Sequence, residues 1–118
     1  MKQEMIRRTK QFAIDVWHLC SKLPHSREYN SYVNQVIRSS SSVAANYRAV
    51  GRAKSKADFI NKLKIVEEAD ESQFFLEVIG EINTNLELSP EIARLIKEAD
   101  ELVAIIVSSL KTARSSNS

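Results

Sequence analysis

Four consecutive serines at positions 39–42 lie inside an apolar repeat, and together these features constrain the fold more than any other part of the chain. The repeat advances by alternate steps of four and three residues, which is the heptad spacing of a packed α-helix. Serine is only a mediocre helix former, so we interpret the run as a patch of small side chains that lets another helix backbone approach closely. A flexible serine-rich linker is the alternative, but a linker has no reason to keep the repeat on both sides. The repeat consists of Tyr29, Val33, Val36, Ser40, Val43, Tyr47 and Val50.

Three further helices are predicted from apolar periodicity and from residues that begin and end helices. Pro24 ends the first helix, because the residue before a proline is pushed out of the α region. Ser26 is suited to cap the second helix, and Gly51 can adopt the left-handed conformation that closes it. Ser55, with Asp58 three residues later, has the spacing of a capping box. The predicted helices cover residues 4–23, 27–50, 56–82 and 90–112, and a tail at 113–118 is expected to fray.

Short connections between long helices make neighbouring helices antiparallel. The predicted fold class is therefore all-α, an up-down-up-down four-helix bundle in one domain that spans residues 1–118. The third helix has a narrow stripe with small residues at its centre, suited to receive the serine patch, which comprises Ile65, Ala69, Ser72, Leu76 and Ile79. The predicted stripe of the first helix comprises Ile6, Thr9, Ala13, Val16, Trp17, Cys20 and Leu23. That of the fourth comprises Ile92, Leu95, Ile96, Ala99, Leu102, Val103, Ile106 and Leu110.

The third helix has more apolar residues than one buried stripe needs. A helix that is apolar on more than one face normally touches more than one neighbour, so we expect an interface between copies of the chain. A broad core face with scattered exposed apolar residues is the alternative. The surplus residues are Phe59, Leu63, Val66, Phe74, Phe75, Val78 and Ile82.

Several classes of protein are disfavoured by what the sequence lacks. No apolar run approaches the roughly 18 residues that span a bilayer, and the first residues lack the apolar stretch of a signal peptide. Cys20 is the single cysteine, so we expect no intramolecular disulfide, a reducing cytoplasmic setting and no membrane contact. The metal-ligand types Asp15, His18, Cys20 and His25 lack the spacing of a zinc site. With no phosphate-binding glycine loop or evident catalytic relay, we expect no metal, no cofactor and no catalytic residues.

Glu67, Glu68, Asp70 and Glu71 form an acidic cluster on the third predicted helix. Paired carboxylates can perform acid–base catalysis, and helical bundles can hold metal ions with them. A hydrolase or metal-dependent enzyme that uses these acids is therefore the alternative function. A structural role is favoured, because counting outward from the turn near residue 53 places Arg38 opposite Glu67 and Glu68. We expect an ion pair that braces the second and third helices.

Charge is unevenly distributed along the chain, although the net charge is only +2. Residues 48–64 carry six cations against one acid, Asp58, whereas acids dominate from 67 to 101. Nucleic-acid phosphates need such cations and little else, so this cluster is the candidate nucleic-acid-binding surface. A merely solvated face is the alternative, and Arg48 could instead pair with Asp58. The candidate residues are Arg48, Arg52, Lys54, Lys56, Lys62 and Lys64.

Three segments of the chain resemble one known family of proteins. They are Ser42-Val-Ala-Ala-Asn46-Tyr-Arg-Ala, Arg52-Ala-Lys-Ser-Lys-Ala-Asp58-Phe-Ile-Asn-Lys-Leu63 and Val66-Glu-Glu-Ala-Asp-Glu-Ser72. The family is that of small four-helix bundle proteins encoded in intervening sequences of bacterial 23S ribosomal RNA genes, and it includes the accessory variability protein of diversity-generating retroelements. The resemblance covers roughly residues 8–110, with the family's asparagine and basic turn at Asn46 and Arg52. It implies a bundle that assembles into a homopentameric ring and has no enzymatic activity. For the retroelement member it also implies a basic surface that binds nucleic acid and a reverse transcriptase.

Residues and resemblance together predict a non-enzymatic, homo-oligomeric assembly module. Its expected partners are further copies of itself, RNA or DNA, and a nucleic-acid-processing protein. A purely structural oligomer with no polyanion partner is the remaining hypothesis.

Overall fold

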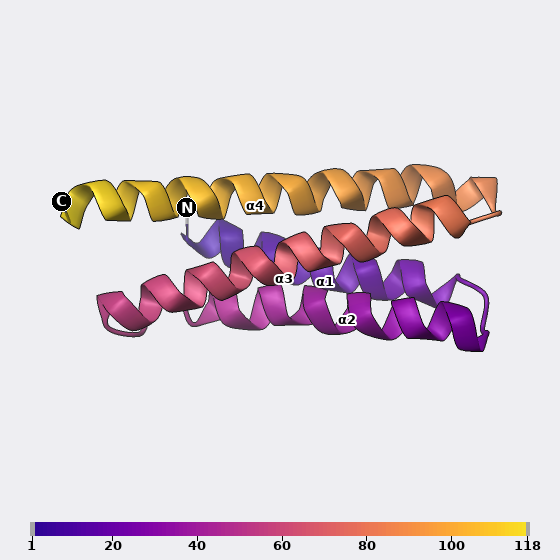
Figure 1. Cartoon of the computed structure of the whole chain (residues 1–118), viewed down its shortest axis with the longest axis horizontal. Coiled ribbons are helices and arrows are strands. Elements are labelled where there is room, and N and C mark those ends of the chain that lie inside the picture. Colours follow the sequence, from indigo (N-terminus) through magenta and orange to yellow (C-terminus); the bar gives the residue numbers. More distant parts are fainter. Residues whose placement is uncertain (1, 118) are drawn as a thin grey trace.

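The structure is a computed structural model that describes the backbone of residues 2–117 and the side chains of residues 2–112. Its order of elements is α1 (Lys2–Ser21), α2 (Arg27–Arg48), α3 (Ser55–Ile82), the short 3₁₀ helix η1 (Leu86–Leu88) and α4 (Ser89–Asn117). Consecutive helices run in opposite directions along a body of 49 × 21 × 21 Å (Figure 1). No β-strand occurs between residues 2 and 117. The predicted all-α four-helix fold is therefore confirmed.

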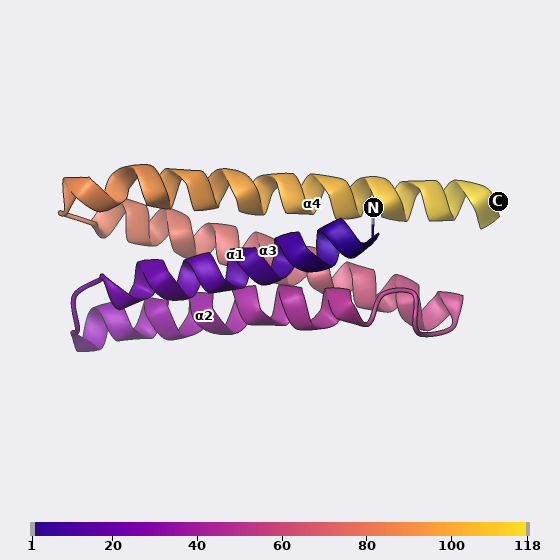
Figure 2. The same cartoon turned by 180° about the vertical axis from the view of Figure 1, so that it is seen from behind.

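The helices contact one another in chain order, and α4 returns to touch α1. This places α1 and α3 diagonally across the bundle, on opposite sides of it. Figure 1 has α3 nearer the viewer, and Figure 2, turned by 180°, has α1 nearer. Because α1 is much shorter than α4, the last part of α4 extends beyond the start of α1.

Local signals place most helix ends within a few residues of their predicted positions. The Ser26 hydroxyl accepts a hydrogen bond from the Tyr29 backbone N–H at 3.1 Å, so its predicted capping role is confirmed. Gly51 has a φ of 84°, the left-handed conformation that glycine adopts without strain. The first helix ends at Ser21 rather than at 23.

The predicted capping box at the start of α3 is wrong. The N-cap is Lys54, and no side chain there bonds to the first turn. Asp58 instead accepts a hydrogen bond from the Gly51 backbone N–H at 2.7 Å. The carboxylate therefore ties α3 to the preceding turn and does not cap its own helix.

The end of the chain also differs from the prediction. The predicted helix ends at residue 112, whereas the helical backbone continues through Asn117, and Ser118 lies outside the described residues. The residues between α3 and α4, predicted as a loop, include the short η1 helix.

Ser39 of the serine patch lies at the contact between α2 and α3, as the small side chains predict. Ser39, Ser40 and Ser72 are fully buried, and the hydroxyl oxygens of Ser39 and Ser72 are 2.7 Å apart. The Ser72 hydroxyl also lies 2.8 Å from the Glu68 carbonyl oxygen, so the buried polar atoms have partners. The five residues of the predicted α3 stripe are the buried residues of that helix.

The first helix is rotated relative to its predicted stripe. Trp17 is 57% exposed, whereas Phe12, which the stripe omits, is 1% exposed. Trp17 lies about 100° around the helix from the fully buried Val16, on a side of α1 that faces solvent. Thr9, Val16, Cys20 and Leu23 are buried as predicted, and the structure adds Met5, Phe12 and Leu19. Burial raises the pKa of the Cys20 thiol to about 11, so it packs as a small neutral residue.

Candidate nucleic-acid interface

The connection between α2 and α3 gathers cations at one end of the bundle. Arg48 ends α2, Arg52 and Lys54 lie in the turn, and Lys56 begins the exposed surface of α3. These four side chains and that of Lys64 are exposed. We call this region, comprising Arg48, Arg52, Lys54, Lys56 and Lys64, the basic end.

Hydrogen bonds hold the turn of the basic end in place. The Asn61 side-chain amide donates to the Asn46 carbonyl at 2.7 Å, which joins α3 to the last turn of α2. The Asn46 amide in turn donates to the Ser42 carbonyl at 2.8 Å. With the bond between Asp58 and Gly51, these contacts fix the backbone that carries the cations. Asn46 and Asp58, which lie in segments that resemble the family, therefore act on the turn's geometry.

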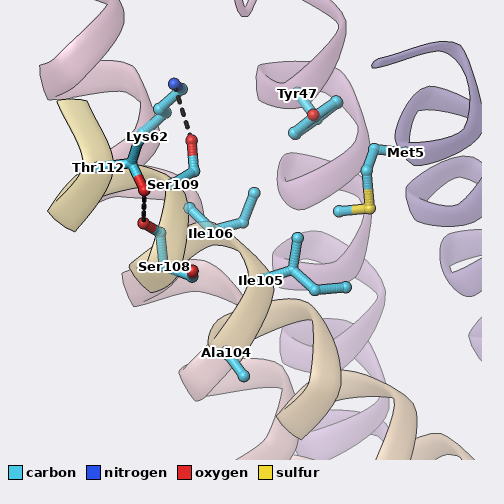
Figure 3. Close-up of a pocket in the computed structure, with 9 residues that line it drawn as sticks. All are labelled: Met5, Tyr47, Lys62, Ala104, Ile105, Ile106, Ser108, Ser109 and Thr112. Carbon is cyan, nitrogen blue, oxygen red and sulfur yellow. Dashed lines mark hydrogen bonds between the residues drawn. The ribbon is translucent and has the colours of Figure 1, made fainter. Parts of the chain in front are cut away.

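Lys62 does not belong to this exposed surface, although the sequence grouped it there. Its side chain is 17% exposed and its ammonium lies 3.8 Å from the Asp58 carboxylate. The ammonium nitrogen is also 3.1 Å from the Ser109 hydroxyl of α4, so the side chain points toward α4 (Figure 3). Asp58 is thus engaged by Lys62 and Gly51, and the alternative pairing of Arg48 with Asp58 is not formed.

An open groove of about 680 Å³ lies beside Lys62, between α4 and the start of α1 (Figure 3). Its walls are mainly apolar, and burial together with the nearby Asp58 raises the pKa of Tyr47. Among the described residues, its lining has no carboxylate and no imidazole. The lining comprises Met5, Tyr47, Lys62, Ala104, Ile105, Ile106, Ser108, Ser109 and Thr112.

The first helix adds cations that sequence analysis missed. Lys10 lines a second groove together with Arg48 and Arg52. The Lys2 ammonium lies over Gly51, 2.6 Å from the position that a Cβ atom would take there. The position of Lys2 and Lys10 could have been inferred from the antiparallel topology, because it places the start of α1 beside the end of α2. The Lys2 side chain is flexible and could move aside, so the positive φ of Gly51 is the feature that favours glycine at this position.

Two acids of the cluster contact Arg38, and one of the two predicted partners, Glu68, is confirmed. Arg38 lies 3.2 Å from the Glu68 carboxylate and also contacts that of Glu71. The hydrogen bond to Glu71 contributes most to raising the pKa of Arg38, and the negative charge of Glu68 contributes next. Glu67 is exposed on another side of α3, because residues one apart diverge by about 100° whereas residues three apart share a face. The predicted partner Glu67 is therefore replaced by Glu71.

The possible metal ligands of the sequence remain apart or take other partners. Asp15 pairs with Arg94 at 3.0 Å, and the His18 ring packs edge-on against Trp17. In the described part of the chain, no three His, Cys, Asp or Glu side chains come close enough to hold a metal ion. Glu68 and Glu71, two of the four acids of the enzyme alternative, are bound by Arg38.

Replacing Arg38 with alanine is expected to lower the melting temperature only slightly, because half of its side chain is in water and exposed ion pairs contribute little. The coupling should be measurable between Arg38 and Glu68 or Glu71. A double-mutant cycle in thermal unfolding, using glutamine at each acid, measures it. Glu67→Gln is the matched control, and coupling of Arg38 to Glu67 as strong as to Glu68 would contradict the observed pairing.

None of the helices described is both long and apolar enough to cross a membrane.

The structure defines an antiparallel four-helix bundle with a cationic end. The family model of the 23S rRNA-intervening sequence protein matches residues 1–108. The chain belongs to this family, and the resemblance seen in the sequence is confirmed.

A solved structure shares the fold. It is the 1.70 Å crystal structure of a protein of unknown function from the S23 ribosomal protein family of Bacteroides thetaiotaomicron. The two superpose with a TM-score of 0.80 at 22% sequence identity, over 94% of this chain and 99% of that one. None of the curated proteins matches the chain.

Proposed function

We propose that this protein is a non-enzymatic assembly module that forms a homo-oligomeric ring and binds nucleic acid through its basic end. The observation that carries the proposal is the set of exposed cations around the α2–α3 turn, where Asp58, the one acid of residues 48–64, is already engaged. Phosphate groups are recognised by such cations at any sequence, because phosphate contacts position a protein without reading bases.

Assembly is supported by the exposed apolar residues of α3 and by the family to which the chain belongs. Leu63, Phe74 and Ile82, three of the seven surplus residues that the sequence indicated, remain exposed in the isolated chain, as does Ile60. The resemblance implies five subunits. A ring repeats the basic end once per subunit, and after the first contact the others bind at a high effective concentration. Weak individual contacts thereby become tight binding to a long polyanion such as RNA.

A protein that processes nucleic acid is the expected third component, since the retroelement relative implies such a partner. The module would hold that enzyme on the nucleic acid and would not itself catalyse a reaction. The competing hypothesis, an enzyme based on the acids at positions 67–71, is disfavoured because Arg38 occupies two of them.

Wild-type protein is expected to show a mass several times the 13.4 kDa chain by light scattering at micromolar concentration. It should bind fluorescently labelled RNA of unrelated sequences with similar affinity. The logarithm of the binding constant should fall with the logarithm of the salt concentration, with a slope of about −0.9 per phosphate neutralised on duplexes and about −0.7 on single strands. Titrations at several salt concentrations measure this slope. A monomer would refute assembly, and binding that is absent or insensitive to salt would refute the polyanion partner.

A further inference from the structure

A continuous stripe of bulky and acidic residues runs along the outer surface of α3. Its members are spaced three and four residues apart and are all exposed, with Ile60, Leu63 and Phe74 between 42% and 56% exposed. Such spacing keeps side chains on one face of a helix. The stripe faces away from the core, which is formed by the opposite stripe that includes Ile65 and Leu76. We call it the α3 ridge, comprising Ile60, Leu63, Glu67, Asp70, Phe74 and Glu77.

A groove of about 560 Å³ lies on a different side of the molecule, between α1 and α2. Its floor is made of small side chains, since the serine run continues into alanines on the outer face of α2. Its rim carries Lys10, Arg48 and Arg52, and no acid lines it. We call it the α1–α2 groove, lined by Lys10, Ala13, Ile14, Ser41, Ala44, Ala45, Arg48, Ala49 and Arg52.

The two surfaces are complementary in shape and charge. Within residues 2–112, no ion pair involves the ridge acids Glu67, Asp70 and Glu77. The same is true of the three groove cations in that part of the chain. Bulky apolar side chains on one surface match a floor of alanines on the other, and unpaired acids match unpaired bases. Such an arrangement gives an interface both packing and specificity.

We propose that the α3 ridge of one copy docks in the α1–α2 groove of the next. This rests on the assembly put forward above and specifies which surfaces form it. The ridge lies on α3, whereas the groove lies between α2 and α1, the helix diagonally opposite α3 (Figures 1 and 2). Each copy therefore uses two different surfaces, one for each of its neighbours. Such a head-to-tail contact generates a ring when the rotation between copies closes. A two-fold contact of ridge against ridge is disfavoured, because it would set Glu67 and Asp70 against like charges.

The contact has two consequences for neighbouring residues. Arg48 and Arg52 are partly covered by the next copy, which leaves Lys54, Lys56 and Lys64 as the cations facing nucleic acid. Trp17 lies one helical turn beyond Ala13 on the same face of α1, so it sits at the edge of the groove. It is the single tryptophan of the chain, and its emission should shift to shorter wavelength as copies associate.

The test uses two variants that change exposed positions only. A ridge variant carries Leu63→Ser and Phe74→Ser. A groove variant carries Ser41→Phe and Ala45→Phe, which fill the groove without altering any charge. Leu86→Ser removes an exposed apolar residue of η1, which belongs to neither surface, and is the matched control. Light scattering should give wild-type mass for the control and monomer mass for each double variant, with an unchanged melting curve when circular dichroism follows unfolding at low concentration.

Mixing the two monomeric variants provides the decisive measurement. Each retains one intact surface, so the mixture should form a one-to-one dimer of twice the 13.4 kDa chain and no larger species. Formation of this dimer also shows that both variants are folded. A mixture that stays monomeric would overturn the head-to-tail contact, as would a wild-type mass retained by either variant. In those two cases the wild-type oligomer and the proposed function stand, whereas a monomeric wild type refutes the assembly itself.

Discussion

Replacing Phe12 with alanine is expected to lower the free energy of unfolding by about 3–5 kcal/mol. Phe12 is 1% exposed and packs among the buried residues of α1 and its neighbours. The loss combines the transfer free energy of the ring with the cavity that it leaves, because a bundle of four helices collapses only partly around the gap. Such a loss is a large fraction of the stability of a small domain. Urea unfolding followed by circular dichroism measures it from the shift in midpoint at a constant slope.

Trp17→Ala is the matched control for Phe12→Ala, because it removes a larger aromatic ring from the same helix. More than half of the Trp17 side chain is in water, and its ring packs edge-on against that of His18. Its removal should therefore cost less than about 1 kcal/mol in the monomer. If Trp17→Ala lowered the free energy of unfolding more than Phe12→Ala, then α1 would be rotated about its axis as the sequence pattern predicted, with Trp17 facing the core. The comparison has to be made at a concentration where copies are dissociated, since Trp17 borders the proposed contact.

The core faces of α2 and α4 were predictable because their small and apolar residues repeat with a single phase. On α3, which is apolar on more than one face, the small residues marked the face that packs in the bundle. On α3 the buried residues are the five of the predicted stripe. The first helix has apolar residues on two adjacent faces, so periodicity alone leaves its rotation open. That rotation accompanies the ion pairs of Arg8 with Glu98, at 2.7 Å, and of Asp15 with Arg94, at 3.0 Å. These partners are 90 and 79 residues apart in sequence, and no local pattern indicates them.

The basic end was partly predictable because most of its residues are close together in the sequence. Most of its cations are consecutive or nearly so around one turn, and exposed turn residues keep their charges in water. Lys62 departs from the group because α4 passes beside it and offers the Ser109 hydroxyl. Lys10 lies in the α1–α2 groove with Arg48 and Arg52 because α1 runs antiparallel to α2, which is a property of the whole fold. Counting residues from the turn correctly predicted how far along α3 the partners of Arg38 lie. It does not determine which side of the helix faces Arg38, and for that reason Glu71 takes the place of Glu67.

Changing Lys54 and Lys56 to glutamate is expected to weaken RNA binding on the order of 10²-fold near 0.1 M salt, and more when several subunits engage one strand. Both side chains are exposed and neither lines the α1–α2 groove, so the mass of the assembly should not change. Each lost phosphate contact removes about one unit from the slope of log K against log salt, so the slope should become shallower by about two.

The matched control for Lys54 and Lys56 carries Lys22→Glu and Lys97→Glu, which alter net charge by the same amount. Lys22 follows α1 at the opposite end of the bundle, and Lys97 lies along α4. A general loss of attraction between a less cationic protein and RNA would weaken both variants equally, whereas a localised surface weakens the first far more. Fluorescence anisotropy at several salt concentrations, with light scattering on the same samples, separates these outcomes. If the two variants lose affinity equally and keep the same salt slope, then phosphates do not contact the α2–α3 turn, and its cations are only a solvated surface.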